Sequence, residues 1–215
     1  MEIKVRGVGE KSFRPDAIKF KFQFSIKRSE YNQCLEDGTK NVENYFNFLK
    51  TKGFNKEELK TQSFNIYRET HYNDKTKKYD EGDFVFSFVC ELIMDYNLEL
   101  MAQIMEETSK INECPTYKVD FTLKDEKQAI DELMKLAYKH AEYQANVISK
   151  ASGKVLKDCV NVSFEPFEGS MSNSYGNMKM MAERCCSSSV DSIQNIFVPK
   201  DVELSFEVYT LWVAE

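Results

Sequence analysis

The sequence predicts an α+β fold built mainly on antiparallel sheets. Apolar and polar residues alternate strictly over 17–28, which is the period-two pattern of a strand with one buried and one wetted face. Other segments carry apolar residues at three- and four-residue spacings, which is the pattern of amphipathic helices. The expected elements follow each other in the order β-(βαββαβ)-αββ, so the chain lacks the regular strand–helix alternation of a doubly wound fold.

Two strands separated by a G-x-G sequence are expected at the start of the chain. Residues 3–8 form a short apolar strand, and the alternating strand over 17–28 follows. Gly7 and Gly9 could belong to a phosphate-binding loop only if a helix began directly after them, because the free N–H groups of a helix start hold the phosphate. The chain instead runs through Pro15 into a strand. We therefore expect the glycines to form a bend or bulge between the two strands.

A helix and a β-hairpin are expected next. The helix covers about 30–52 and is followed by Gly53, a residue type favoured just after a helix end. Residues 59–72 and 83–94 are expected to form two strands, with the polar segment 72–82 as a long exposed tip. The buried stripe of the helix is expected to consist of Tyr31, Cys34, Leu35, Val42, Tyr45, Phe46 and Leu49.

The second half of the chain is expected to contain two more helices. One covers about 97–110, and Pro115 follows it as a breaker. The longer one covers about 125–151 and is closed by Gly153; alanines at four-residue steps give it a narrow face that a neighbour can approach closely. The stripe of this helix is expected to be Ile130, Leu133, Met134, Ala137, Ala141, Ala145 and Ile148, and the remaining strands are expected at 116–123, 156–164 and 202–213.

The elements group into a single domain, 1–215, with two layers. Residues 17–123 have the ferredoxin-like order βαββαβ. Residues 1–16 and 124–215 supply the remaining strands and the long helix, so the second layer is expected to include both ends of the sequence. Segment 167–195 is rich in Ser, Asn, Gly and Met without clear periodicity, and we expect a flexible or contact loop there.

Composition and charge narrow the classes of function. A chain of 215 residues that is 42% hydrophobic can bury a core. Its net charge of -6 argues against a nucleic-acid-binding surface. No apolar run approaches the roughly 20 residues that span a bilayer, and Met1 leads directly into a strand without a basic-then-apolar leader, so we expect no membrane span and a cytoplasmic location.

Recognised catalytic patterns are absent from the sequence. Its two histidines, His71 and His140, are expected at a strand end and on the long helix, and no G-x-S-x-G surrounds a serine. Neighbouring carboxylates are expected on solvated turns and helix faces. The carboxylate pairs are Asp80–Glu81, Glu106–Glu107 and Asp131–Glu132. We therefore assign no catalytic and no cofactor-binding residue.

One cluster of sulfur-containing residues supports a sharper hypothesis. The segment 171–186 combines several Met side chains with a Cys–Cys pair, and thioether and thiolate ligands suit Cu(I). The same thiols could be oxidised or could pair between chains. The spacing matches no regular metal motif, so contact packing by Met is favoured over a metal or redox site. The candidate ligands are Met178, Met180, Met181, Cys185 and Cys186; the other four cysteines, Cys34, Cys90, Cys114 and Cys159, are expected to be small apolar core residues.

Motifs spread over the whole sequence carry a family resemblance. The opening I-x-V-x-G-x-G spans residues 3–9 and is followed by Pro15-Asp16, and the expected third strand holds Thr61 and Tyr67. A strand of the form f-x-l-x-d at 121–125 precedes the alanine-rich helix. A closing P-x-x-v-x-l-x-f-x-v pattern runs over 199–208. In this order and spacing, the chain resembles the SIMPL-domain family, which includes the 26 kDa periplasmic immunogenic protein and bacterial oxidative-stress defence proteins.

The resemblance implies assembly rather than a reaction. The family offers no established catalytic residue or cofactor to transfer. Its members are linked to stress protection and the cell envelope, and at least one resembles a ring- or channel-like homo-oligomer. We therefore expect a non-enzymatic, homo-oligomerising domain whose partner is itself or another protein. Two alternatives stay open: a small-molecule-binding protein or enzyme with a pocket between the layers, and a copper-binding or redox-responsive protein that uses the Met/Cys segment.

Overall fold

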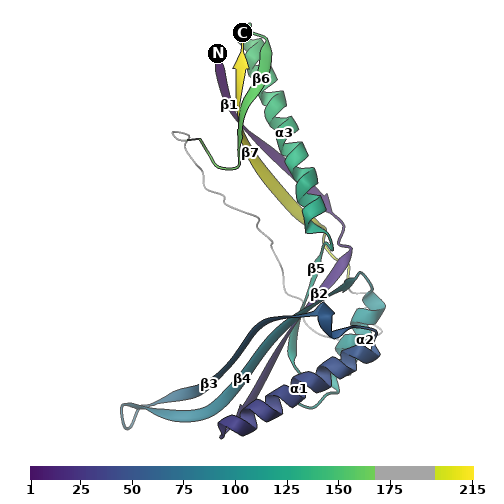
Figure 1. Ribbon diagram of the computed structural model, residues 1–215, viewed down its shortest axis with the longest axis vertical. Coiled ribbons are helices and arrows are strands. Elements are labelled where there is room, and N and C mark those ends of the chain that lie inside the picture. The colour runs from purple at the N-terminus through teal and green to yellow at the C-terminus, as the bar shows by residue number, and fades with distance from the viewer. Residues whose placement is uncertain (168–196) are drawn as a thin grey trace. The chain divides into compact units, whose positions relative to one another are not determined.

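The computed structural model describes residues 1–167 and 197–215, and these form two compact units (Figure 1). The described part of one unit, here the four-stranded unit, is 16–122 with 197–199. The described part of the other, the three-stranded unit, is 1–15, 123–167 and 200–215. Both units combine helices with antiparallel strands, which confirms the predicted α+β class.

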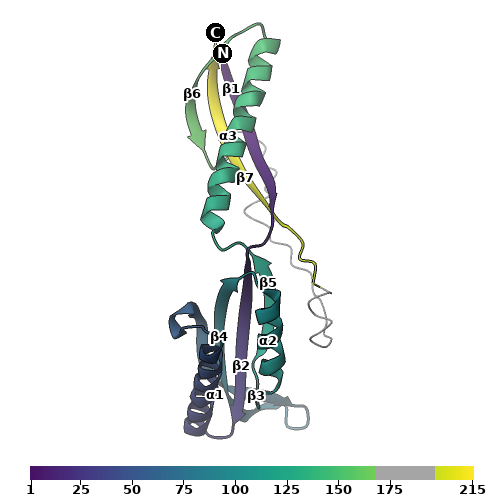
Figure 2. The same cartoon turned by 90° about the vertical axis from the view of Figure 1, so that its right-hand side faces the viewer.

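The four-stranded unit has the ferredoxin-like topology that its element order predicts. Its strands lie in the order β3-β4-β2-β5, and every neighbouring pair is antiparallel. Both α-helices cover the same face of this sheet (Figure 2). The elements are β2 (Ala17–Arg28), α1 (Tyr31–Thr51), a 3-10 turn (Lys56–Glu58), β3 (Leu59–Asn73), β4 (Lys78–Asp95), α2 (Leu98–Ser109) and β5 (Thr116–Thr122).

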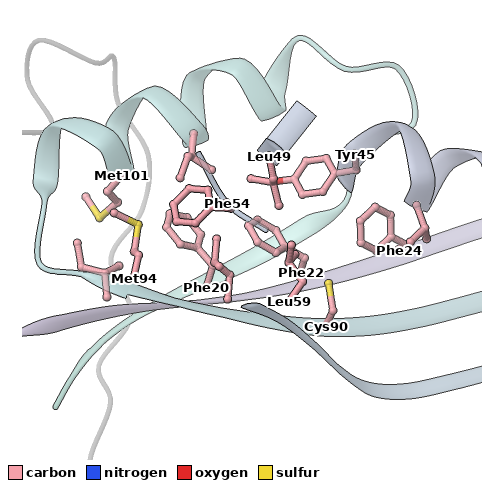
Figure 3. Close-up of a cluster of buried hydrophobic side chains, with 14 of the residues drawn as sticks. Phe20, Phe22, Phe24, Tyr45, Leu49, Phe54, Leu59, Cys90, Met94 and Met101 are labelled. Atoms are coloured by element: carbon pink, nitrogen blue, oxygen red, sulfur yellow. The ribbon is translucent and has the colours of Figure 1, made fainter. Parts of the chain in front are cut away.

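Aromatic side chains fill the core of the four-stranded unit (Figure 3). The alternating residues of β2 supply Phe20, Phe22 and Phe24, all fully buried, as their period-two pattern predicts. Tyr45 of α1 packs edge-on against Phe22 and Phe24 with ring centroids 5.0 and 5.4 Å away. Met101 of α2 extends the cluster. This core fixes both helices on one face, and no helix of the described residues covers the other face of the sheet.

The three-stranded unit places one helix on a sheet made from both ends of the sequence. Strand β7 lies in the centre, with β1 and β6 on either side, and all pairs are antiparallel. Helix α3 lies along this sheet (Figure 1), and its alanines pack against β1 and β7 with Trp212 and Val208. The elements are β1 (Glu2–Phe13), α3 (Glu126–Ala151), β6 (Leu156–Ser163) and β7 (Val202–Ala214).

The predicted bend at Gly7 and Gly9 is wrong. Both residues lie inside β1, whose register with β7 runs unbroken from Glu2 to Phe13. A Cβ on Gly7 would lie 2.0 Å from the backbone oxygen of Ala137, and one on Gly9 would lie 2.2 Å from that of Leu133. The glycines therefore allow α3 to approach the strand, and the chain leaves the strand after Phe13, at 14–16.

Two other expectations need correction. The hairpin tip is far shorter than 72–82, because β3 continues to Asn73 and β4 begins at Lys78. These terminal segments have no buried face, so their side chains show no alternation that would reveal a strand. Tyr31 and Ile148, expected in buried helix stripes, are both exposed. The helix ends are as predicted: Gly53 and Gly153 have φ values of +94° and +72°. None of the helices in the described ranges is long and apolar enough to cross a membrane.

Candidate functional site

The two histidines occupy separate structural roles. His140 of α3 has its Nδ1 atom 3.1 Å from the backbone nitrogen of Val8, and its Nε2 atom lies 2.9 Å from the side-chain amide of Gln144. His71 of β3 is exposed, with Nε2 3.7 Å from a carboxylate oxygen of Glu69. Neither of these described contacts brings a cysteine or serine nucleophile to an imidazole.

Each predicted carboxylate pair has at least one member in an ion pair with a lysine or arginine. Glu81 pairs with Arg68 across the hairpin, and Glu107 accepts a hydrogen bond from Lys52 at 2.8 Å. Glu106 pairs with Lys110 one helical turn away, and this hydrogen bond raises the pKa of the lysine. Glu132 pairs with Lys11 at 2.6 Å. These contacts are those of solvated structural carboxylates.

The candidate sulfur ligands lie outside the described structure. Met178, Met180, Met181, Cys185 and Cys186 all lie outside the described residues. Among the residues that the structure does describe, no three His, Cys, Asp or Glu side chains cluster as a metal site would require. The expectation of core cysteines holds for Cys34 and Cys90, whereas Cys114 is exposed and Cys159 is half-buried.

An exposed sheet edge is the most distinctive surface of the described structure. Strand β3 is at one edge of the four-stranded sheet (Figures 1 and 2). Its residues 63–68 pair with β4 in unbroken register, with irregularities on each side, between Thr61 and Ser63 and between Arg68 and Thr70. We call residues 63–68 the β3 edge. Its outer backbone groups form a template on which another strand can pair.

The side chains of the β3 edge are apolar and poorly covered. Phe64 is 55% exposed although it shares the helix-covered face of the sheet with Phe86, its ring neighbour at 5.4 Å. Ile66 is half-buried on the same face. Tyr67, on the opposite face, is 47% exposed. Helix α1 packs over β2 and β4, the strands next to β3. The ring contact between Phe46 of α1 and Phe88 of β4 therefore lies beside the outermost strand.

Charges stand at the end of the β3 edge but not within it. Residues 61–67 carry no ionisable side chain except the Tyr67 phenol. Beyond them, the Arg68 guanidinium lies 5.2 Å from the ring centre of Phe84 and pairs with Glu81. Glu69 accepts a hydrogen bond from Lys27 at 2.6 Å and thereby raises the pKa of that lysine. The uncharged stretch therefore ends at Arg68 and Glu69, and each of these charges is paired with an opposite charge of the same unit.

The other three edge strands of the two sheets are protected. Strand β5 is short and holds a Lys118–Asp120 ion pair at 2.7 Å. Strand β1 is rich in charged residues, and the side chain of His140 contacts Val8. Strand β6 has two irregularities in its pairing with β7, which break a regular template. Proteins use charges, coverage and bulges to prevent edge pairing. Among the residues that the structure describes, none gives the β3 edge such protection over 63–67.

Sequence reasoning did not single out this surface. The strand was predicted, and Tyr67 was noted, but the position of a strand at the edge of a sheet depends on the pairing of other strands. One usable signal was present: seven uncharged residues, Thr-Gln-Ser-Phe-Asn-Ile-Tyr, in a chain that is 30% charged. An uncharged, β-prone stretch with an aromatic residue on each face indicates a surface for pairing.

Comparison with known proteins agrees with the resemblance seen in the sequence. No curated protein matches the chain. A family model, SIMPL, described as a protein of unknown function (DUF541), matches residues 3–212. The match runs from the glycine-bearing β1 into β7, and so includes both units. Over nearly its whole length, the chain therefore belongs to the SIMPL family.

Proposed function

We propose that this protein is a non-enzymatic domain that acts by assembling with copies of itself through the β3 edge. The observation that carries the proposal is the exposure of Phe64 and Tyr67 on an uncharged, regularly paired edge strand. An exposed aromatic edge of this kind favours association, because pairing satisfies its backbone groups and removes apolar area from water.

The distribution of titratable groups supports a binding role over a catalytic one. The described contacts of His71 and His140 are to a carboxylate, a backbone group and an amide, which suits structural roles. At least one member of each predicted carboxylate pair forms an ion pair with a lysine or arginine. The resemblance to oxidative-stress defence proteins supports stress protection as the setting in which such an assembly acts.

Light scattering coupled to size-exclusion chromatography tests the proposal. The wild-type protein at micromolar concentration is expected to have a mass that is a multiple of 25.1 kDa. Phe64→Lys and Tyr67→Lys place a charge on the edge and are expected to lower that mass, because the charge would have to be desolvated on association. A strictly monomeric wild-type protein would overturn the proposal.

A matched control separates edge pairing from a general effect of charge. Tyr143 of α3 is 67% exposed and lies in the other unit. Tyr143→Lys makes the same chemical change at a comparably exposed aromatic residue and is expected to leave the assembled mass unchanged. Equal dissociation by Tyr143→Lys and Tyr67→Lys would count against the β3 edge as the contact surface.

A further inference from the structure

We propose that β3 pairs antiparallel with β3 of a second copy about a two-fold axis at Asn65, joining two four-stranded sheets into one of eight strands. The inference rests on the proposed function, and it adds the partner strand, its direction and its register. An isologous contact of this kind uses the same surface on both copies, so the β3 edge must complement itself.

The apolar side chains determine which faces of the two sheets meet. Phe64 and Ile66 pair with Phe88 and Phe86 of β4 and so lie on the helix-covered face; Asn65 is opposite Ser87 and lies on the open face. Directly opposed residues in an antiparallel pair point to the same side of the sheet. The helix-covered faces of both copies lie on one side of the joined sheet only if the two-fold axis passes through a residue position. An axis that passes between two residues would place these faces on opposite sides. A register centred on a residue places each residue opposite one from the same face of the second copy's sheet.

Charge and packing then select one of the possible centres. Pairing about Phe64 would place Lys60 opposite Arg68 of the second copy, and like charges directly opposed are destabilising. Pairing about Ile66 would place Phe64 opposite Arg68, whose guanidinium already stacks on Phe84. Pairing about Asn65 places Phe64 opposite Ile66 of the second copy, twice by symmetry, and opposes no like charges between Lys60 and Thr70.

The open face of the sheet fits the same register. There, Ser63 lies opposite Tyr67 of the second copy, again twice. An aromatic side chain thus gains cover from a small residue rather than meeting another aromatic ring in the same space. Flanking this centre, Gln62 lies opposite Arg68, a neutral partner for the guanidinium. The paired stretch 63–67 falls inside the segment with unbroken β4 register, so the edge is straight where pairing is proposed.

Single-cysteine cross-linking tests the register, because only a residue on the two-fold axis meets its own copy. Asn65→Cys is introduced into full-length protein in which Cys114, Cys159, Cys185 and Cys186 are changed to Ser; Cys34 and Cys90 remain because both are buried. Copper phenanthroline, or a short bis-methanethiosulfonate linker, is then applied. We expect Asn65→Cys to give a covalent dimer as the main product on non-reducing gels.

Two matched variants serve as controls. Ser63→Cys and Tyr67→Cys lie on the same face and strand as Asn65. In the proposed register, each of these cysteines is displaced by four residues from the same cysteine of the second copy. Each variant alone is therefore expected to cross-link at least tenfold less than Asn65→Cys. A mixture of the two is expected to yield covalent dimers, since Ser63 lies opposite Tyr67 of the second copy. The two variants are briefly unfolded and refolded together before purification, so that their chains exchange.

The outcomes separate this inference from the proposed function. An oligomer by light scattering in which Asn65→Cys does not cross-link leaves assembly intact and overturns the register. Strong cross-linking of Ser63→Cys or Tyr67→Cys alone also overturns it, in favour of another centre. A monomeric wild-type protein overturns both. Cross-linking at Asn65 and in the Ser63/Tyr67 mixture, with weak single controls, supports the pairing as stated.

Discussion

Gly7 of β1 lies directly against the backbone oxygen of Ala137 in α3, so close that a Cβ on the glycine would be 2.0 Å from that oxygen. Real Cβ atoms do not approach this near, and the obstacle is backbone rather than a flexible side chain. Ala141 contributes a second limit at 2.8 Å. The packing of helix on strand in the three-stranded unit thus requires glycine at this position.

We predict that Gly7→Ala destabilises the protein by about 1 to 3 kcal/mol, because the added methyl group must push the helix away from the strand. Urea unfolding followed by circular dichroism measures the change. Glu10→Ala is the matched control: this residue lies on the same strand and is exposed, so its substitution is expected to change the unfolding free energy by less than about 0.5 kcal/mol. Equal stability of wild type and Gly7→Ala would contradict the close packing.

A buried hydrogen bond joins the two helices of the four-stranded unit. The Tyr45 hydroxyl lies 2.9 Å from Thr108 Oγ1, and Thr108 donates to the backbone oxygen of Ile104 at 2.6 Å. Because the threonine proton is used, the tyrosine must be the donor. Thr108→Val removes the acceptor and leaves a buried hydroxyl unpaired, so we predict a loss of about 1 to 3 kcal/mol of unfolding free energy.

A double-mutant cycle checks that assignment of donor and acceptor. Tyr45→Phe leaves Thr108 bonded to Ile104 and is expected to cost less, about 0.5 to 1.5 kcal/mol. The double variant has no unpaired hydroxyl, so its loss is expected to be smaller than the sum of the two single losses. Strict additivity would show that the two hydroxyl groups do not interact.

The Cys90 thiol makes stability depend on alkaline pH. Burial, with a smaller effect of Glu91, raises the pKa of this thiol from 9.0 to about 12. Its stabilising contribution is complete below pH 9, where folded and unfolded thiols are both protonated. As pH rises above that value, the unfolded state loses its proton first, so stability falls until the folded thiol also ionises.

We predict that the advantage of wild type over Cys90→Ala shrinks by up to about 1.4 kcal/mol for each pH unit between 9 and 11. Urea unfolding of both proteins at pH 8, 9, 10 and 11 measures it. Both carry the other titrating groups, including Tyr45, whose pKa is raised mainly by burial, so those effects cancel in the difference apart from the smaller charge interaction between Cys90 and Tyr45. A difference that stays constant over this pH range would show that the Cys90 thiol does not titrate in this way.

Periodicity predicted the fold wherever one face of an element is buried. The Phe-lined strand β2 and the alanine stripe of α3 were both predicted correctly, since burial of one face imposes a regular pattern. The hairpin beyond Arg68 lies outside any core, and the start of its second strand was placed at 83 instead of Lys78 for that reason. The role of Gly7 depends on α3, which follows more than a hundred residues later, so local sequence could not distinguish close packing from a bend.

The candidate surface was less accessible to prediction than the fold. Tyr67 and its strand were identified, yet the exposure of Phe64 on the helix-covered face depends on where α1 ends its cover of the sheet. That limit is a property of packing between elements. The same holds for the protection of β1 by His140, a contact between residues 132 positions apart.

The pairing of β1 with β7 also has a consequence for biosynthesis. Glu2 lies opposite Val213, whereas the strands of the four-stranded sheet all fall between residues 17 and 122. At typical ribosomal rates of about 5 to 20 residues per second, β1 waits roughly 10 to 40 s for its partner strand. The four-stranded unit can form most of its contacts during this interval, while Ile3 and Val5 stay exposed to chaperones. The three-stranded sheet can therefore be completed only after every strand of the four-stranded sheet has been synthesised.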